Sequence, residues 1–102
     1  MRQVTLGKSG LVVSAVGFGG IPIQRVTDEE ATSVIRAALE FDVTFLDTAA
    51  GYGDSQKKIG RAIADRRHGL VLASKSGERT REGILADVER SCRELEIGRA
   101  HV

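Results

Sequence analysis

The arrangement of this chain follows from one stretch of its sequence, Phe45-Leu46-Asp47-Thr48-Ala49-Ala50-Gly51-Tyr52-Gly53. It begins as the end of a continuous apolar run, Val43 to Leu46, which is typical of a buried parallel strand. An acid, Asp47, follows that run directly, and Lys75 ends the next apolar run, Leu70 to Ser74, in the same way. Functional groups gather at the strand ends of α/β folds. We therefore expect opposite charges at one edge of a sheet, with the only tyrosine, Tyr52, between the two strands.

Length and composition limit what the chain can be. Its 102 residues make one domain at most, and 41% apolar with 28% charged residues is close to the globular average. A net charge of +1 argues against an electrostatic nucleic-acid or membrane role. The sequence has no apolar run near the ~20 residues of a membrane span and no apolar signal core at its start. The single Cys92 indicates a reducing, cytoplasmic setting.

The residues before this stretch predict a hairpin, a short strand and a helix. Apolar residues alternate around the turn 7–10, which is a hairpin signal. Ala15 to Gly19 is expected to be a short buried strand that ends before Pro22. Thr27 and Glu30 fit a capping box at the start of a helix. Its apolar stripe is Ala31, Val34, Ile35, Ala38 and Leu39.

Two further helices follow, on either side of a third strand. Asp54 or Ser55 is expected to cap a helix with Ile59, Ala62 and Ile63 on its apolar face and with its basic residues in water, namely Lys57, Lys58, Arg61, Arg66 and Arg67. A strand from Leu70 to Lys75 comes next. Thr80 then caps a helix whose apolar face is Ile84, Leu85, Val88, Cys92 and Leu95.

This order indicates an α/β fold with parallel βαβ units. A doubly wound sheet would require G-x-G-x-x-G at the first strand-to-helix turn, but Gly17-Phe18-Gly19 is followed by Gly20, Ile21 and Pro22, so the third glycine is missing. A (β/α)8 barrel places functional groups at the end of each successive strand, as here. We therefore predict an N-terminal β-hairpin plus the first three βα units of a (β/α)8 barrel, which is incomplete at this length.

Four pieces of the sequence, in this order and spacing, carry a family resemblance: residues 6–14, 17–20, 47–55 and 73–75. On these pieces, the chain resembles the aldo-keto reductase family from residue 4 to residue 95. The resemblance implies a TIM barrel closed at its floor by the hairpin, and reduction of a small-molecule carbonyl with NADPH, or with NADH. It also implies that Asp47, Tyr52 and Lys75 are three members of a catalytic tetrad and that Gly19, Gly20, Ile21 and Asp47 bind the cofactor. Gln56 departs from the family, which usually has glutamate there.

The chemistry explains why these residue types would be needed. Hydride addition to a carbonyl builds negative charge on oxygen, so an acid must supply a proton there, and Tyr52 is the candidate. A phenol has a pKa of about 10, which burial would raise. The Lys75 ammonium would oppose this, since at ~4 Å and an effective dielectric of ~20 the pair interacts by about 4 kcal/mol. Asp47 would keep that lysine charged.

Each of these residues also has a structural interpretation. Asp47 and Lys75 fit an ordinary ion pair at a sheet edge. Tyr52 fits a packing residue with its hydroxyl in water, and the glycines beside it fit a turn. We assign no metal ligands, and His68 is expected in a solvated loop without a role.

The end of the chain differs from what the resemblance implies. The tetrad histidine at the end of a fourth strand is missing, and His101 follows Leu95 too closely to replace it. Residues 96–102 show neither strand periodicity nor a helix stop. One back-translation that the genetic code permits for them, GAG ATC GGA AGA GCA CAC GTC, resembles the start of a sequencing-library adapter. We expect residues 1–95 to be the N-terminal part of a barrel and 96–102 to be a non-native tail.

Three functional interpretations remain open. The first is a truncated NADPH-dependent reductase whose fragment is inactive and, through its unpaired strand edges, prone to aggregate. The second is a non-catalytic binding or regulatory subunit of the same family. The third is a small α/β domain that forms oligomers. The identity of the substrate cannot be derived from these residues.

Overall fold

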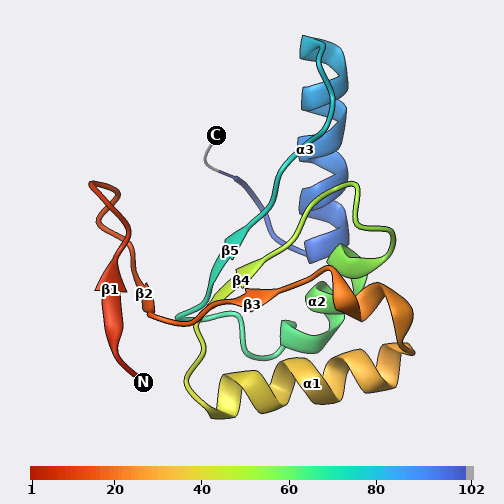
Figure 1. The fold of residues 1–102 in the computed structure, drawn as a ribbon. Coiled ribbons are helices and arrows are strands. Elements are labelled where there is room, and N and C mark those ends of the chain that lie inside the picture. Colours follow the sequence, from red (N-terminus) through yellow and green to blue (C-terminus); the bar gives the residue numbers. More distant parts are fainter. Residues whose placement is uncertain (101–102) are drawn as a thin grey trace.

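The centre of the structure is a three-stranded parallel sheet. A computed structural model describes residues 1–100, and His101 and Val102 lie outside the described residues. The strands are β3 (Phe18–Gly19), β4 (Phe45–Asp47) and β5 (Val71–Ala73), in the spatial order β3-β4-β5 (Figure 1). Because all three run in the same direction, their carboxyl ends meet at one edge, as the α/β prediction requires.

The hairpin lies at the opposite end of this sheet. Strands β1 (Gln3–Thr5) and β2 (Val12–Ser14) pair antiparallel, which confirms the predicted hairpin. Ser14 donates its N–H to Thr44 Oγ1 (2.8 Å), and Thr44 donates its N–H to Ser14 Oγ (2.9 Å). Thr44 directly precedes β4, so these two bonds fix the hairpin against the amino end of the sheet and away from the strand ends that carry charge.

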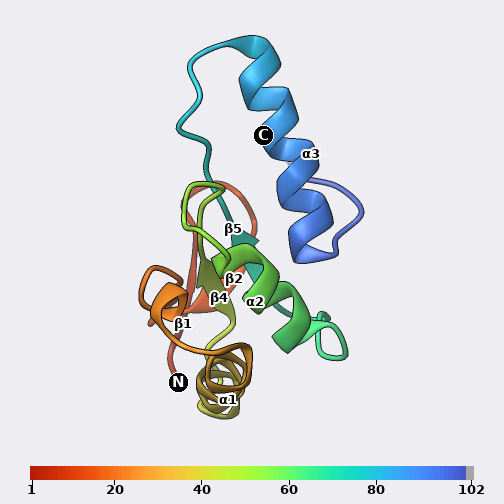
Figure 2. The ribbon, with the colours of Figure 1, turned by 90° about the vertical axis from the view of Figure 1, so that its right-hand side faces the viewer.

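Three helices follow the strands in turn: α1 (Asp28–Glu40), α2 (Ser55–Ile63) and α3 (Arg81–Leu95). The side chains of Thr27 and Thr80 accept hydrogen bonds from the N–H groups of Glu30 (3.1 Å) and Gly83 (3.0 Å), which confirms both predicted caps. A short 3₁₀ helix, η1 (Pro22–Arg25), was not predicted. Helices α2 and α3 lie on the same side of the sheet (Figure 2).

The core lies between these helices and one face of the sheet. Leu46 is fully buried, and its register partners Phe18 and Leu72 pack against the same cluster. The helices contribute Ile35, Leu39, Ile59, Ile63 and Leu95. Successive strand residues point to opposite faces, so Phe45 and Val71 face the other side. An open apolar groove of about 650 Å³ runs from these two residues around the free edge of β5, between the hairpin and α3. Residues 1–100 therefore form no closed barrel.

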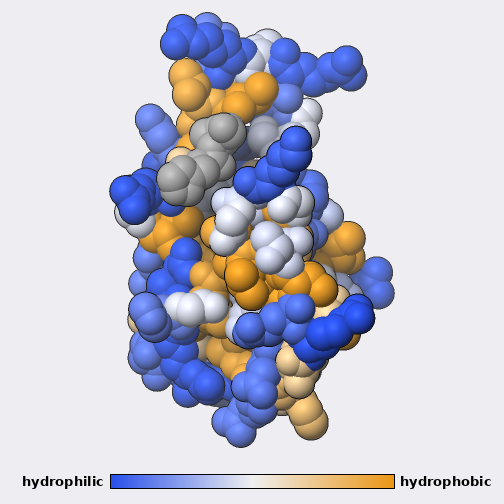
Figure 3. Space-filling view, turned by 90° about the vertical axis from the view of Figure 1, so that its left-hand side faces the viewer, coloured by the Kyte–Doolittle hydropathy of each residue, from blue (hydrophilic) through white to orange (hydrophobic). Residues whose placement is uncertain are grey.

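Some residues expected in the core are exposed. Val34 on α1 is 50% exposed, because α2 and the sheet cover only the narrower stripe through Ala31, Ile35 and Leu39. Ile84 and Leu85 lie at the start of α3, which extends beyond the sheet, and only the far end of that helix, at Leu95, is buried (Figure 1). Apolar side chains are also visible in patches on the side where the hairpin lies (Figure 3).

The end of α3 corrects one expectation about the tail. Glu96 adopts the left-handed conformation with φ of 58°, and its N–H bonds to the carbonyl of Arg93 (3.2 Å). The N–H of Ile97 bonds to the carbonyl of Cys92 (3.0 Å), which completes a Schellman helix stop, and Ile97 packs against the core. The expectation of no helix stop was wrong because a glutamate occupies the position that usually signals one. Among residues 1–100, no helix is both long and apolar enough to cross a membrane.

Candidate active site

Asp47 and Lys75 form an ion pair at the carboxyl edge of the sheet. Asp47 is the last residue of β4, and Lys75 follows the end of β5 by two residues. The Lys75 Nζ lies 3.2 Å from Asp47 Oδ1 and 3.1 Å from Oδ2, and it donates to the carbonyl of Thr48 at 2.6 Å. The side chains of Lys75 and Asp47 are 51% and 47% exposed. The pair is therefore fixed in position but accessible to a ligand.

Tyr52 completes this group of side chains. Its loop, residues 48–54, joins β4 to α2 and is held to the end of β5 by the bond from Ala50 N–H to the carbonyl of Lys75 (3.0 Å). Arg90 on α3 donates to the carbonyl of Ala50 from the other side (2.8 Å). The Lys75 ammonium lies over the Tyr52 ring, 5.0 Å from its centroid. Lys75, which is far from both in sequence, is thus brought together with Asp47 and Tyr52.

The electrostatics of Lys75 follow from these contacts. Partial desolvation is the largest single influence and lowers the pKa of the ammonium. The hydrogen bonds and the negative charge of Asp47, with a further contribution from Tyr52, together outweigh it and hold the pKa of Lys75 above its ordinary value of 10.5. Lys75 is therefore a stable positive charge beside a phenol ring at neutral pH.

The predicted cofactor residues differ in their surroundings. A Cβ on Gly20 would lie 2.7 Å from Ser55 Oγ and 2.9 Å from the carbonyl oxygen of Asp47, so packing alone requires glycine there. A Cβ on Gly19 would meet nothing within 4 Å. Ile21 is 48% exposed. Gly19, the register partner of Asp47, and Ile21 thus border open space, whereas Gly20 joins β3 to α2.

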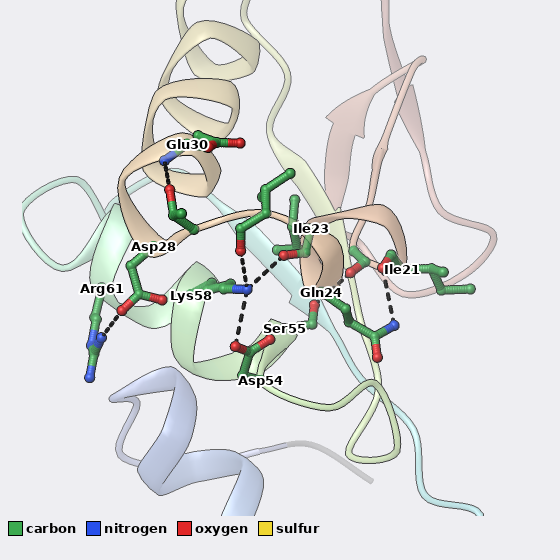
Figure 4. A network of polar contacts seen from close by, with 12 residues as sticks. Ile21, Ile23, Gln24, Asp28, Glu30, Asp54, Ser55, Lys58 and Arg61 are labelled. Carbon is green, nitrogen blue, oxygen red and sulfur yellow. Dashed lines mark hydrogen bonds and ion pairs between the residues drawn. The ribbon is translucent and has the colours of Figure 1, made fainter.

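Lys58 was predicted to face water, and this is wrong. Its side chain is 3% exposed and reaches across to the segment that follows β3. The ammonium donates to the carbonyls of Ile23 (2.8 Å) and Val26 (2.7 Å) and pairs with Asp54 Oδ2 at 3.0 Å (Figure 4). The Asp54–Lys58 spacing of four residues was the available signal for the ion pair, but the carbonyl partners are visible only in three dimensions.

Gln56 also has a more specific place than its sequence suggested. It is 1% exposed, accepts a bond from Ser74 Oγ (2.5 Å) and donates to Glu94 Oε1 (2.9 Å). An amide can do both, since it carries an acceptor and a donor, whereas an ionised glutamate could not donate to Glu94. Gln56 therefore links the end of β5 to α2 and α3.

The remaining candidate residues are the two histidines and any possible metal ligands. His68 is exposed in the loop before β5, as expected, and His101 lies outside the described residues. Within residues 1–100, no group of three or more His, Cys, Asp or Glu side chains is arranged to hold a metal ion.

Comparison with known proteins identifies the family. The model of the aldo/keto reductase family matches residues 15–100. The chain is 38% identical over 85 residues to the uncharacterized oxidoreductase YqkF of Bacillus subtilis, covering 81% of this chain and 28% of that protein. It is 36% identical over 94 residues to L-galactose dehydrogenase of Arabidopsis thaliana, covering 83% and 29%.

A solved structure gives the same result. The holo form of the aldo-keto reductase AKR11C1 from Bacillus halodurans superposes with a TM-score of 0.85 at 29% identity, covering 95% of this chain and 37% of that one. The chain thus spans less than a third of the length of either curated relative described above. By sequence and by fold, it belongs to the aldo/keto reductase family.

Proposed function

We propose that this chain is the N-terminal part of an NADPH-dependent reductase that converts an aldehyde or ketone to an alcohol, and that it supplies three of eight βα units. The observation that carries the proposal is the position of the Lys75 ammonium, which binds Asp47 and lies 5.0 Å from the centre of the Tyr52 ring. The open apolar face of the sheet, with Phe45 and Val71, is where the interior of a completed barrel would form.

Each of the three side chains has a distinct task in this proposal. Tyr52 donates a proton to the carbonyl oxygen as negative charge develops there. Lys75 stabilises the charge that the phenol oxygen then carries, since a positive group nearby favours the ionised form. Asp47 keeps Lys75 charged and oriented through its two hydrogen bonds. The remaining member of the tetrad, a histidine, would come from outside this chain.

The residues at the edge of the sheet are compatible with a bound nicotinamide. NADPH, when bound, would supply the hydride; NADH is the alternative. Gly19 leaves open space beside its register partner, the half-exposed Asp47, and Ile21 offers an exposed apolar surface two residues further on. We propose that Gly19, Ile21 and Asp47 contact the cofactor and that Gly20 acts by holding this edge together.

The test is a carbonyl-reduction assay on the complete protein that contains this sequence, followed by the loss of NADPH absorbance. Tyr52→Phe removes the proton donor and keeps the ring, so kcat should fall by about 10²–10⁴-fold. A fully active Tyr52→Phe protein would contradict the assigned role. Phe41→Tyr serves as a control because Phe41 is 76% exposed and precedes the amino end of β4, whereas the cluster lies at the carboxyl end of that strand.

We also propose that the chain of 102 residues has no reductase activity by itself, since most of the cofactor site would lie elsewhere. Its open groove and the edge strands β3 and β5 favour association with other chains. NADPH titration followed by fluorescence should show no saturable binding. A cooperative melt of a monomeric chain, with NADPH binding, would contradict this proposal.

A further inference from the structure

Two segments that belong to different βα units are packed against each other behind Tyr52. We call residues 20–26 the β3–α1 segment and residues 48–54 the tyrosine loop. At one end, Ser55 Oγ, just after the loop, donates to the carbonyl of Gly20 (2.8 Å). In the middle, Gly53 packs so closely on Gln24 that a Cβ there would lie 2.9 Å from Gln24 Oε1. These contacts place the β3–α1 segment as a support for the loop.

Lys58 joins the two segments at the other end of this contact (Figure 4). An ammonium has three N–H donors, and here all three have acceptors: two carbonyls of the β3–α1 segment and the carboxylate of Asp54 in the tyrosine loop. Asp54 is two residues from Tyr52. The Lys58 side chain is 3% exposed and that of Asp54 is 51% exposed, so the two carbonyls depend on Lys58 more than the carboxylate does.

The orientation of α2 makes this link possible. Arg61, one turn further along α2, pairs with Asp28 at the start of α1, and both of these side chains are more than half exposed. Lys58 points inward from the same helix and meets the carbonyls at the end of η1, where a helix leaves such groups without partners of its own. Lys58 is therefore the buried contact and Arg61 the surface contact between α2 and the region before α1.

We propose that Lys58 is a positioning residue for Tyr52. By binding the carbonyls of Ile23 and Val26 and the carboxylate of Asp54 together, it holds the tyrosine loop against the β3–α1 segment. This fixes where the Tyr52 ring lies relative to Lys75. The catalytic importance of that position rests on the proposed function, but the positioning itself is a property of residues 20–58.

The proposal is tested on the 102-residue chain in dilute solution. The sequence has one tyrosine and no tryptophan, so its tyrosine fluorescence comes from Tyr52 alone. Lys58→Met should make Tyr52 more accessible to quenching by iodide. Tryptic cleavage after Arg25, within the β3–α1 segment, should become about tenfold faster or more, because bonds to a charged donor are lost. Asp54→Asn, which leaves the two carbonyl bonds, should give smaller changes in the same direction.

Lys57→Met is the matched control, since Lys57 is the neighbouring residue on α2, carries the same charge and is exposed. It should leave quenching and cleavage as in the original chain. The proposal is overturned if a folded Lys58→Met chain, judged by circular dichroism, keeps the original quenching, or if Lys57→Met changes it equally. Should Lys58→Met fail to fold, unchanged quenching in folded Asp54→Asn overturns it instead. Neither quenching nor tryptic cleavage requires NADPH or a carbonyl substrate, so this test and the reductase assay can fail independently.

Discussion

Lys58 and Lys75 have nearly the same set of partners, yet they occupy very different environments. Each ammonium pairs with one aspartate, and each also donates to backbone carbonyl oxygen. The Lys58 side chain is 3% exposed and the Lys75 side chain is 51% exposed. Lys58 has two carbonyl partners on a separate segment, whereas Lys75 has one, in the loop that follows Asp47.

The difference shows how one residue type can serve structure or chemistry. A buried lysine whose three donors are all occupied has nothing left to offer a ligand, and its loss would leave buried oxygens without partners. A half-exposed lysine contributes little to folding but presents its charge to whatever binds beside it. We therefore expect substitutions at these two positions to affect different measurements.

The largest effect is expected at Lys75, and on activity. In the complete protein, Lys75→Met removes the charge next to Tyr52, and kcat should fall by about 10²–10³-fold. The free energy of unfolding should change by less than about 1 kcal/mol, because the ion pair is half exposed. Steady-state kinetics and urea unfolding measure the two quantities. A large loss of stability with unchanged kcat would mean that Lys75 serves structure rather than chemistry.

Lys58→Met should show the opposite pattern. It leaves the carbonyls of Ile23 and Val26 without their donor, so the free energy of unfolding should fall by about 2–4 kcal/mol. Urea unfolding measures this change, and Lys57→Met should differ from the original protein by no more than about 0.5 kcal/mol. Equal effects of the two substitutions would mean that the buried contacts contribute nothing to stability.

Gly19 and Gly20 provide a second comparison between a structural position and a proposed binding position, this time in the backbone. Gly20→Ala forces a Cβ onto Ser55 Oγ and the Asp47 carbonyl oxygen, so it should cost about 1–3 kcal/mol of stability. Gly19→Ala meets no atom within 4 Å and should leave stability nearly unchanged. In the complete protein, Gly19→Ala should instead weaken NADPH binding, measured by fluorescence titration. Normal NADPH affinity would remove Gly19 from the proposed cofactor site.

The smallest effect concerns pH. Because Asp47 and Tyr52 hold the pKa of Lys75 above 10.5, the folded state binds this proton more tightly than the unfolded state. This stabilisation is fully present below the pKa that Lys75 has in the unfolded state. It is lost as the pH rises through the pKa that Lys75 has in the folded state. The stability difference between the original protein and Lys75→Met should thus be constant near neutrality and shrink above about pH 10.5. If the stability difference between the two proteins grew as the pH rises, the predicted direction of the pH dependence would be contradicted.

Much of the fold was predictable because its signals are local. Threonine caps mark the starts of α1 and α3, and apolar runs ending in Asp47 and Lys75 mark β4 and β5. The exposure of Val34 and Leu85 was not predictable, since an apolar stripe shows which side of a helix is suited to burial but not how much of it finds a partner. The left-handed Glu96 gave no signal either, because glycine or asparagine usually occupies that position.

The sequence by itself determined the order of strands and helices, the family, and the placement of an acid and an amine after successive strands. Those properties depend on side-chain periodicity and on residues close in sequence. Only the tertiary structure decided that the ammonium of Lys75 lies over the Tyr52 ring and that Lys58 is buried. Both depend on contacts across more than twenty residues of chain, and the environment of a charge is set by which segments surround it rather than by its neighbours in sequence.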